Sequence, residues 1–372
     1  MMPDDVKVLV VDDSAVIRAL MCELITAAPG LSVVGKARNG RDALEMLWNL
    51  RPDVVTLDIQ MPDMNGLEVL DTILQLQPTP VIMVSTLTQA GAMIALEALD
   101  RGAVDYLAKP GGNAATRALF ASEIVEKIRN AAGIDVRRMM ARRRRRPPVV
   151  ATTPPLKAET TNCPGALAEK CIALGISTGG PPALEKLLSA LRPPQPPIVI
   201  VQHMPPQFTG PLAARLNNAS ALSVREASQG DVLEPNCVYV APGGKHLELA
   251  RRGSHVKVLI RDGDTVSGHK PSADVMMLSA AEVFGQNCLG VIMTGMGRDG
   301  ANGCRAIRAA GGYVLGQDET SSDVYGMNKV AFVEGNVDQQ FSLQEAAAVI
   351  TRCIRRPAVT MAGRNSSNDG LY

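Results

Sequence analysis

The sequence has few aromatic residues and almost no net charge, and both shortages restrict what it can bind. Phe, Tyr and Trp make up 3% of the 372 residues, which leaves few rings for stacking nucleobases. The 38 Lys and Arg side chains nearly balance 37 Asp and Glu, giving a formal net charge of +1. Such a balance provides no general attraction to nucleic acid or to an acidic membrane. We therefore expect no nucleic-acid partner.

Disulfide signatures and membrane-spanning runs are also lacking. The seven cysteines form no C-x-x-C pair and are odd in number, which favours reduced thiols over a disulfide framework. No apolar run approaches the roughly 18 residues of a membrane span. The start "MMPDDVKVLVVDD" is acidic, unlike a signal peptide. These absences predict a cytoplasmic protein that does not insert into a membrane.

Residues 1–125 alternate between strand-like and helix-like patterns five times, which predicts one α/β domain. Apolar runs of strand length recur at regular intervals, and each is followed by apolar residues at helical spacing. The expected strands cover residues 7–11, 32–37, 53–58, 80–85 and 104–109. This order is typical of a doubly wound parallel sheet, a (βα)5 domain.

Residues 126–165 break the alternation and are rich in Arg and Pro, so we expect a linker without regular structure. Within it, the run Arg142 to Arg146 could contact nucleic acid or acidic lipid, but such a block is usually a solvated segment. Alternation resumes over residues 166–356, which predicts a second α/β domain with a mainly parallel sheet. A β-hairpin is expected around "CVYVAPGGKHLELA", and residues 357–372 are expected to form a flexible tail.

Polar residues end four of the five strands expected in the first domain. Asp12 and Asp13 end the first, Asp58 the third, Ser85 the fourth and Lys109 the fifth. Ligands of open parallel sheets bind at this edge. Three carboxylates repel one another unless a cation joins them, and Mg²⁺ prefers such oxygen ligands. Lys109 and Ser85 can hold an anion beside the metal. The pattern predicts a site that places phosphate on a carboxylate.

A lone serine stands in the second domain where the apolar run "CIALGI" turns into a helix. Glycines stand on both sides of Ser177 in "GISTGG", and this turn resembles the G-x-S-x-G elbow that exposes a nucleophile. The helix start offers N–H groups to a developing negative charge. A simple helix cap in a glycine turn is the alternative.

A serine nucleophile needs a base and an orienting acid. His203 directly follows the strand "PIVIVQ", which we expect beside the strand that ends at Ser177. Asp299 lies just past a strand ending near residue 294. His269 is a rival that could bind substrate, and the two remaining histidines are His246 and His255. The three residue types predict a Ser-His-Asp arrangement in a chain order that does not exclude it.

The loop around Asp299 also fits a dinucleotide-binding pattern. Gly295, Gly297 and Gly300 match G-x-G-x-x-G, and Asp318 follows about twenty residues on. In that interpretation Asp299 would face the pyrophosphate and repel it. We therefore favour the catalytic interpretation of the loop.

Residues 1–125 resemble response-regulator receiver domains in the segments "VDDS", "LDIQMPDMNGLEVL", "VIMVST" and "DYLAKP". The resemblance implies that Asp58 accepts phosphate from a histidine kinase. It also implies Mg²⁺ at Asp12, Asp13 and Asp58. Two further roles follow from the resemblance: Ser85 and Lys109 sense the phosphoryl group, and Tyr106 is the aromatic switch.

Residues 168–355 resemble the catalytic domain of the chemotaxis protein-glutamate methylesterases, the CheB family. The matching segments are "GISTGGPPAL", "VQHMP", "APGGKHLEL", "HKPSADVMM" and "MTGMGRDGANG". The resemblance implies that Ser177 attacks the γ-methyl ester of a receptor glutamate, that His203 carries the proton and that Asp299 orients His203. The backbone around Thr178 and Met296 would line the oxyanion hole.

The same resemblance implies methanol as the product and deamidation of particular receptor glutamines, without a cofactor for the esterase reaction. The implied partners are a chemotaxis histidine kinase and methyl-accepting receptors. We further expect the tethered receiver to cover Ser177 in the resting state, since a tether keeps it at high effective concentration. Two rival interpretations are a DNA-binding transcription regulator and a pseudo-enzyme that only binds receptors.

Overall fold

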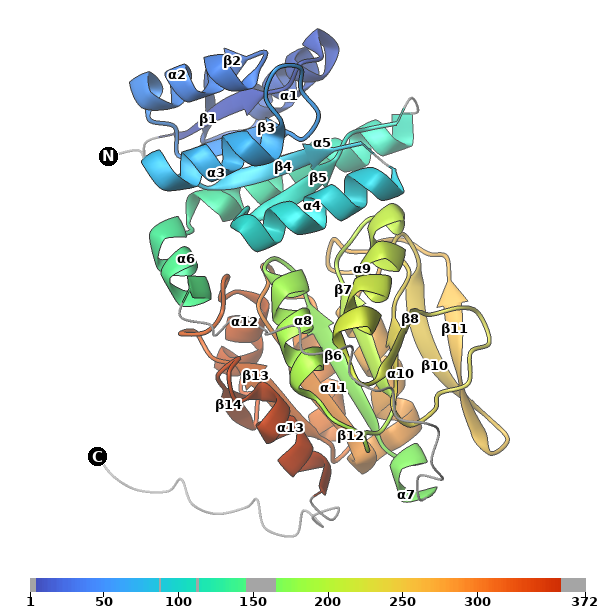
Figure 1. Cartoon of the computed structure of the whole chain (residues 1–372). Helices are drawn as coiled ribbons and strands as arrows, with labels where there is room; N and C mark the ends of the chain where they lie inside the picture. Colours follow the sequence, from blue (N-terminus) through green and yellow to red (C-terminus); the bar gives the residue numbers. More distant parts are fainter. Residues whose placement is uncertain (1–4, 87, 112–113, 145–164, 356–372) are drawn as a thin grey trace, which may run out of the picture.

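The structure is a computed structural model that describes residues 5–86, 88–111, 114–144 and 165–355 (Figure 1). The tail 357–372, most of the expected linker, and Arg145 and Arg146 of the arginine run lie outside the described residues. Figure 1 shows two α/β halves, one above the other, with helix α4 of the first facing helices α8 and α9 of the second. Among the described residues, no helix combines the length and the apolar character needed to cross a bilayer.

The first half is the parallel five-stranded sheet that the sequence predicts, in the order β2-β1-β3-β4-β5. The strands are β1 (Val6–Val11), β2 (Leu31–Ala37), β3 (Val54–Asp58), β4 (Val81–Ser85) and β5 (Asp105–Ala108). The helices are α1 (Ala15–Ala27), α2 (Gly40–Leu50), α3 (Gly66–Leu76), α4 (Gln89–Arg101) and α5 (Ala114–Ala132). Strands β3 and β4 are buried along their whole length, which explains why both are apolar runs without polar alternation.

The structure differs from the prediction where the linker was expected to begin. Helix α5 continues to Ala132, and a further helix, α6 (Val136–Arg144), follows it. The side chains of Val136 and Met139 are buried in the same apolar cluster as the first sheet. Met, Ala and Arg are good helix formers, and the prolines that oppose helix formation start only at residue 147.

The second half is built on a seven-stranded sheet in which every neighbouring pair is parallel, in the order β14-β13-β12-β6-β7-β9-β8. Its strands are β6 (Cys171–Ile176), β7 (Ile198–Gln202), β8 (Ser223–Glu226), β9 (Cys237–Val240), β12 (Cys288–Ile292), β13 (Tyr313–Gln317) and β14 (Gln339–Phe341). Its helices are α7 (Gly165–Ala168), α8 (Gly180–Ala190), α9 (Pro206–Ala219), α10 (Ala273–Phe284), α11 (Ala301–Ala309), α12 (Met327–Val333) and α13 (Ala346–Arg355), with a 3-10 turn at Gly285–Asn287.

The antiparallel hairpin exists, but only one of its two strands lies in the expected segment. Strands β10 (His246–Arg252) and β11 (His255–Arg261) pair with each other, whereas Cys237–Val240 joins the main sheet as β9. Three of the four residues of β9 are buried, whereas burial decreases along β10 toward the turn and alternates along the first half of β11. A short strand with both faces covered belongs in a sheet interior.

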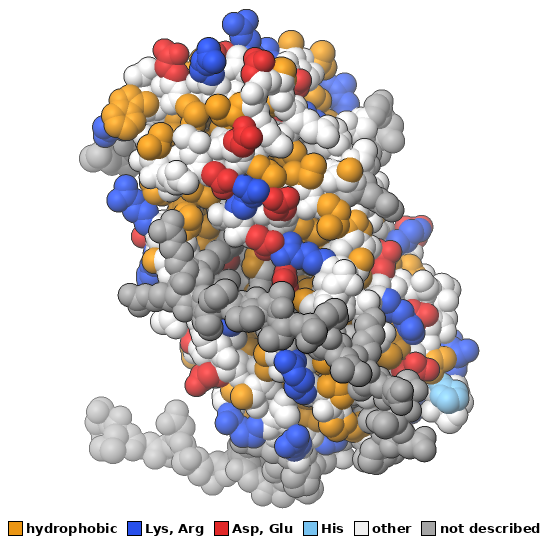
Figure 2. Space-filling view, viewed as in Figure 1, with side chains coloured by type: hydrophobic (Ala, Val, Ile, Leu, Met, Phe, Trp, Pro, Cys, Tyr) orange, Lys and Arg blue, Asp and Glu red, His pale blue; other side chains and the backbone are white. Residues whose placement is uncertain are grey.

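The two halves meet through stacked rings and ion pairs. The rings of Tyr106 and Phe208 stack with their centroids 4.5 Å apart. Arg215 of α9 lies 2.5 Å from the carboxylate of Asp100 on α4 and also pairs with Glu185 of α8. Figure 2 shows blue and red side chains side by side where the halves meet, and a mixture of both signs over the rest of this face. The receiver-like half is therefore docked on the second half by specific contacts.

Candidate active site

Two neighbouring strands place Ser177 and His203 next to each other. In the parallel pair β6–β7, Ile176 lies opposite Gln202, so the residue after each strand emerges at the same edge. The His203 N–H donates to the Ile176 carbonyl at 3.3 Å, and the Ser177 N–H donates to the Thr294 carbonyl on the other side at 3.0 Å. The pairing of the strands therefore positions Ser177 and His203.

A tight turn presents Ser177 at the start of helix α8. Gly179 has φ 77, a left-handed conformation that favours glycine, and the Gly180 N–H donates to the Ser177 carbonyl at 2.7 Å. The side-chain amide of Gln202 donates to the carbonyls of Ser177 and His203, at 3.1 and 3.3 Å. No sequence pattern singles out Gln202, although it precedes His203 directly.

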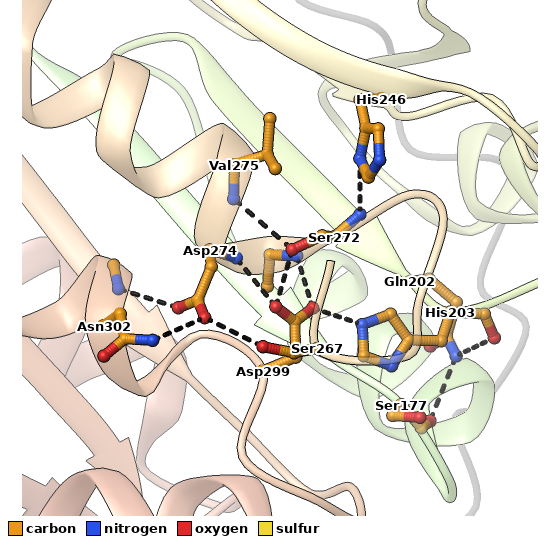
Figure 3. Close-up of polar contacts among 12 residues, drawn as sticks. Ser177, Gln202, His203, His246, Ser267, Ser272, Asp274, Val275, Asp299 and Asn302 are labelled. Atoms are coloured by element: carbon orange, nitrogen blue, oxygen red, sulfur yellow. Dashed lines mark hydrogen bonds and ion pairs between the residues drawn. The ribbon is translucent and has the colours of Figure 1, made fainter. Parts of the chain in front are cut away.

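Asp299 meets His203 from the loop after β12. The Nε2–H of His203 donates to Asp299 Oδ2 at 2.7 Å, and Asp299 is fully buried. The other ring nitrogen, Nδ1, is buried and has no hydrogen-bond partner among the described residues. Figure 3 shows this nitrogen on the side of the ring that faces Ser177. The structure therefore brings together the three residues expected to form the triad, with Nδ1 left available as a base.

Three further donors hold the Asp299 carboxylate. They are the hydroxyl of Ser272 at 2.6 Å and the N–H groups of Ala273 and Asp274 at 2.6 and 3.1 Å. Burial alone would raise the pKa of Asp299, but the hydrogen bonds from His203, Ser272 and the backbone outweigh it and lower this pKa. Asp299 is thereby kept ionised beside His203.

The other histidines have different surroundings. His269 stacks on His203, with ring centroids 3.7 Å apart and planes 10° apart. Burial, and secondarily the charge of His203, lowers the pKa of His269 to about 3, so it stays neutral. His246 accepts a hydrogen bond from the Ser272 N–H, whereas His255 is exposed on β11. His269 therefore packs face to face over the ring of His203.

The loop Gly295–Gly300 closes tightly on the serine. A Cβ at position 295 would lie 2.7 Å from the Ser177 Cβ, so only glycine fits there. The N–H groups of Thr178 and Met296 donate no hydrogen bond within the described part of the chain. The glycines that resembled a dinucleotide-binding pattern thus allow this loop to reach the serine while Asp299 bonds to His203.

A cavity of about 410 Å³ lies over these residues, between the two halves. Ser177, His203, His269 and Met296 line it from the second half. The receiver half contributes Leu99 of α4, Val104 just before β5, and residues of β5 and α5, which are Asp105, Tyr106, Ser122, Glu123, Glu126, Lys127 and Asn130. The first half therefore forms one wall of the cavity that Ser177 and His203 line.

One hydrogen bond crosses this cavity at the serine turn. The hydroxyl of Thr178 donates to Asp105 Oδ2 at 2.8 Å, and the ammonium of Lys127 lies 2.7 Å from the other oxygen of Asp105. No sequence spacing predicted this contact, because the two residues belong to different halves. It places a receiver carboxylate within reach of a group expected at the oxyanion hole.

The second candidate site lies at the edge of the first sheet, as predicted. Lys109 Nζ lies 2.9 Å from Asp12 Oδ2 and 2.8 Å from Asp58 Oδ2. Burial and the charge of Asp12 outweigh Lys109 and raise the pKa of Asp58 to about 6. Ligand atoms of Asp12, Asp13 and Asp58 lie within 4.8 Å of one another, and Asp13 is exposed. Clustered hard oxygens with one open side fit Mg²⁺.

The residues expected to sense phosphate lie at the end of β4, on β5 and directly after β5. Ser85 is buried at the end of β4, and its hydroxyl donates to the Thr86 carbonyl at 3.3 Å. Tyr106 is buried against Phe208, and its hydroxyl has no hydrogen-bond partner among the described residues. Tyr106 therefore lies at the interface between the halves, on the strand that Lys109 follows.

The chain is similar to known proteins along most of its length. The family model described as "CheB methylesterase" matches residues 172–350, and "Response regulator receiver domain" matches residues 8–120. The chain is 45% identical over 350 residues to "Protein-glutamate methylesterase/protein-glutamine glutaminase 4" of Anaeromyxobacter dehalogenans, covering 94% of this chain and 95% of that protein. It is 47% identical over 339 residues to "Protein-glutamate methylesterase/protein-glutamine glutaminase 1" of Caulobacter vibrioides, covering 91% and 95%. The crystal structure of the Thermotoga maritima CheB methylesterase catalytic domain aligns with 36% identity and a TM-score of 0.48, covering 49% of this chain and 97% of that one.

Proposed function

This chain belongs to the CheB methylesterase family, and on that premise we propose which of its residues carry out the reaction and how the first half controls it. Its activity is that of a protein-glutamate methylesterase and protein-glutamine glutaminase of chemotaxis adaptation, regulated by a receiver domain. The observation that carries the proposal is the contact of His203 with buried Asp299, at a strand end beside the one that presents Ser177.

In this proposal Ser177 is the nucleophile. Its Oγ attacks the side-chain carbonyl carbon of a glutamate methyl ester, and His203 takes the hydroxyl proton. The tetrahedral oxyanion accepts hydrogen bonds from the N–H groups of Thr178 and Met296. Breaking the C–O bond to the methoxy group releases methanol, which leaves with the proton from His203. Water, deprotonated by His203, then attacks the acyl-serine, and the glutamate carboxylate and Ser177 are restored.

The same steps deamidate a receptor glutamine, because only the leaving group differs. The amide nitrogen takes the proton from His203 and departs as ammonia. Since His203 donates its Nε2–H to Asp299, its base is Nδ1, the reverse of the nitrogen assignment in the chymotrypsin triad. No cofactor is needed for either reaction.

The first half, residues 1–125, is the regulatory input in this proposal, and residues 166–356 are the catalytic output joined to it by the segment 126–165. A chemotaxis histidine kinase supplies the phosphoryl group to Asp58. Mg²⁺ bound by Asp12, Asp13 and Asp58 would offset the negative charge gathered there. Lys109 and Ser85 then contact the phosphoryl group in place of their present partners.

We propose that the docked receiver keeps receptors away from Ser177 until phosphorylation weakens the interface. Lys109 now pairs with both Asp12 and Asp58, and a phosphoryl group on Asp58 would redirect it. Tyr106 would then leave its stacked position on Phe208, and Asp105 would release Thr178. Only contacts that differ between the two receiver states shift this balance. We place these events in the cytoplasm, where both partners present their substrates.

The test is methanol release from methylated receptor membranes by four proteins with single substitutions, alongside the native chain. Ser177→Ala and His203→Ala should each lower the rate by several orders of magnitude, and Asp299→Ala should lower it less, because it acts only through His203. Double substitutions should cost little more than the worst single one. Near-native turnover in folded Ser177→Ala protein would overturn the assignment. A larger loss in His269→Ala than in His203→Ala would assign the base to His269.

A further inference from the structure

The start of helix α10 (Ala273–Phe284) lies against the carboxylate of Asp299 and donates hydrogen bonds to it. Ser272 is the residue before this helix, and it reaches Asp299 with its side chain (Figure 3). Asp299 Oδ1 accepts from the Ser272 hydroxyl and the Asp274 N–H, while Oδ2 accepts from the Ala273 N–H and His203. Two donors on each oxygen fix the plane of the carboxylate. The direction of the His203 ring follows from that plane.

Asp299 depends on these donors because its own loop is rich in glycine. Gly297 and Gly300 have φ 86 and 90, a left-handed conformation on either side of Asp299. Glycine segments have high conformational freedom, so the loop supplies little stiffness of its own. The first turn of α10 therefore supplies the rigid frame, and Ser272 is its side-chain contribution.

Ser272 is itself fixed from two sides. Its N–H donates to Nδ1 of His246 at 3.3 Å, and Nε2–H of His246 donates to the Asp264 carbonyl at 2.8 Å. Its Oγ accepts from the Val275 N–H at 3.4 Å, which caps the helix. With its oxygen facing that N–H, the hydroxyl hydrogen is free to point at Asp299, at 2.6 Å. Ser272 thus joins the helix cap, buried His246 and the Asp299–His203 pair.

The neighbouring carboxylate of Asp274 has separate partners. It accepts from the Gly303 N–H at 2.8 Å, the Asn302 amide at 3.2 Å and the Ser267 hydroxyl at 3.4 Å. The contact of Asp274 with Asp299 is made by its backbone N–H alone. Ser272 is therefore the side chain, besides His203, whose hydrogen bond to Asp299 a substitution can remove.

We propose that Ser272 is a positioning residue of the esterase: its hydroxyl orients Asp299 and, through it, the ring of His203. This inference rests on the proposed triad. Because Ser272 lies behind Asp299, its loss should reduce turnover and leave substrate binding unchanged. The expected size is a fall in kcat of roughly tenfold or more, the order seen when an outer hydrogen bond to a reactive group is removed.

The experiment uses the full chain with Mg²⁺ and a small phosphodonor, and measures kcat and KM for methanol release from methylated receptor membranes. Ser272→Ala should lower kcat by roughly tenfold or more with KM unchanged. Ser272→Thr, which keeps a hydroxyl and a helix cap, should recover most of the loss. Ser279→Ala is the matched control, because Ser279 lies on the same helix and bonds to the Leu249 N–H, away from Asp299. It should match the native chain.

Combining substitutions distinguishes a positioning role of Ser272 from a purely structural one. In an Asp299→Ala background, Ser272→Ala should cost no further activity, because the group that Ser272 orients is gone. An equal loss in both backgrounds, or a loss confined to thermal stability, would overturn the positioning role. The downfield imidazole N–H proton resonance of His203 should broaden or shift in Ser272→Ala and not in Ser279→Ala. Full activity of Asp299→Ala would instead refute the triad itself.

Discussion

Loosening the interface between the halves should activate the resting enzyme. The perturbation is the double substitution Asp100→Ala and Tyr106→Ala, which removes the ion pair with Arg215 and the ring stacked on Phe208. Both positions lie in the receiver, so the catalytic half is untouched. The Tyr106 hydroxyl has no hydrogen-bond partner among the described residues, so the substitution removes ring packing without breaking a hydrogen bond of that hydroxyl.

The size of the effect follows from these two contacts. A stacked aromatic pair contributes about 0.5–1.5 kcal/mol beyond its buried area, and a partly exposed ion pair contributes about 0.2–1 kcal/mol. Since about 1.4 kcal/mol is a factor of ten, the ratio of undocked to docked chains should rise roughly 3- to 60-fold. The resting rate should rise by the same factor, up to the rate of a fragment that starts near residue 164.

The assay is the initial rate of methanol release from methylated receptor membranes without phosphodonor, compared between the native chain, the double variant and that fragment. Stimulation by Mg²⁺ and phosphodonor should shrink as the resting rate rises. Glu97→Ala is the control, because Glu97 lies on the same helix, is exposed and pairs with Arg101 within the receiver. If a folded double variant keeps the low resting rate, the docked receiver does not restrain the enzyme.

Two further predictions concern titrating groups. Asp58→Asn should stabilise the receiver by about 1–3 kcal/mol near pH 7.5 in buffer with a chelator, because folding raises the pKa of this carboxyl from 3.8 to about 6. The stability that protonated Asp58 supplies is complete below the unfolded pKa and is lost as pH rises through about 6. In urea denaturation, the free energies of unfolding of the native chain and of Asp58→Asn should therefore converge toward pH 4. A variant less stable than the native chain near pH 7.5 would contradict this. His269→Asn should lower kcat but leave the shape of the pH–rate profile between about pH 5 and 8 unchanged, because the pKa of His269 is already depressed to about 3. A shift of the acid side of that profile would show that His269 titrates between about pH 5 and 8.

The sequence predicted the sheets and the residues at their edges better than the hydrogen bonds that hold those residues and the contacts between the two halves. The alternating patterns correctly indicated a parallel five-stranded sheet and a second, mainly parallel sheet. Parallel strands gather their carboxyl ends at one edge, so residues as distant as Asp12 and Lys109 could be expected to meet. The roles of Ser177, His203 and Asp299 stay predictions that the proposed substitutions test.

Other features depended on packing that no local pattern shows. Gln202 and Ser272 make side-chain hydrogen bonds whose partners are set by the turn of a loop. The contact of Asp105 with Thr178 requires the docking of two halves that are far apart in sequence. Helix α6 formed where proline nearby suggested a linker, because its own residues favour helix and two of them are buried against the first sheet.

In the proposed mechanism all the groups that carry out the chemistry come from the second half of the chain, and the receiver controls them by covering them. Input and output are therefore related by the affinity of one surface for another. Substitutions on the faces of α4 and α9 that contact each other can set how much phosphorylation is needed for a response, without altering the rate of the undocked enzyme. By the same logic, a different domain that docks on α8 and α9 and can be released would serve as an equally effective input. The threshold of the signal and the speed of the reaction are thus separately adjustable properties of this fold.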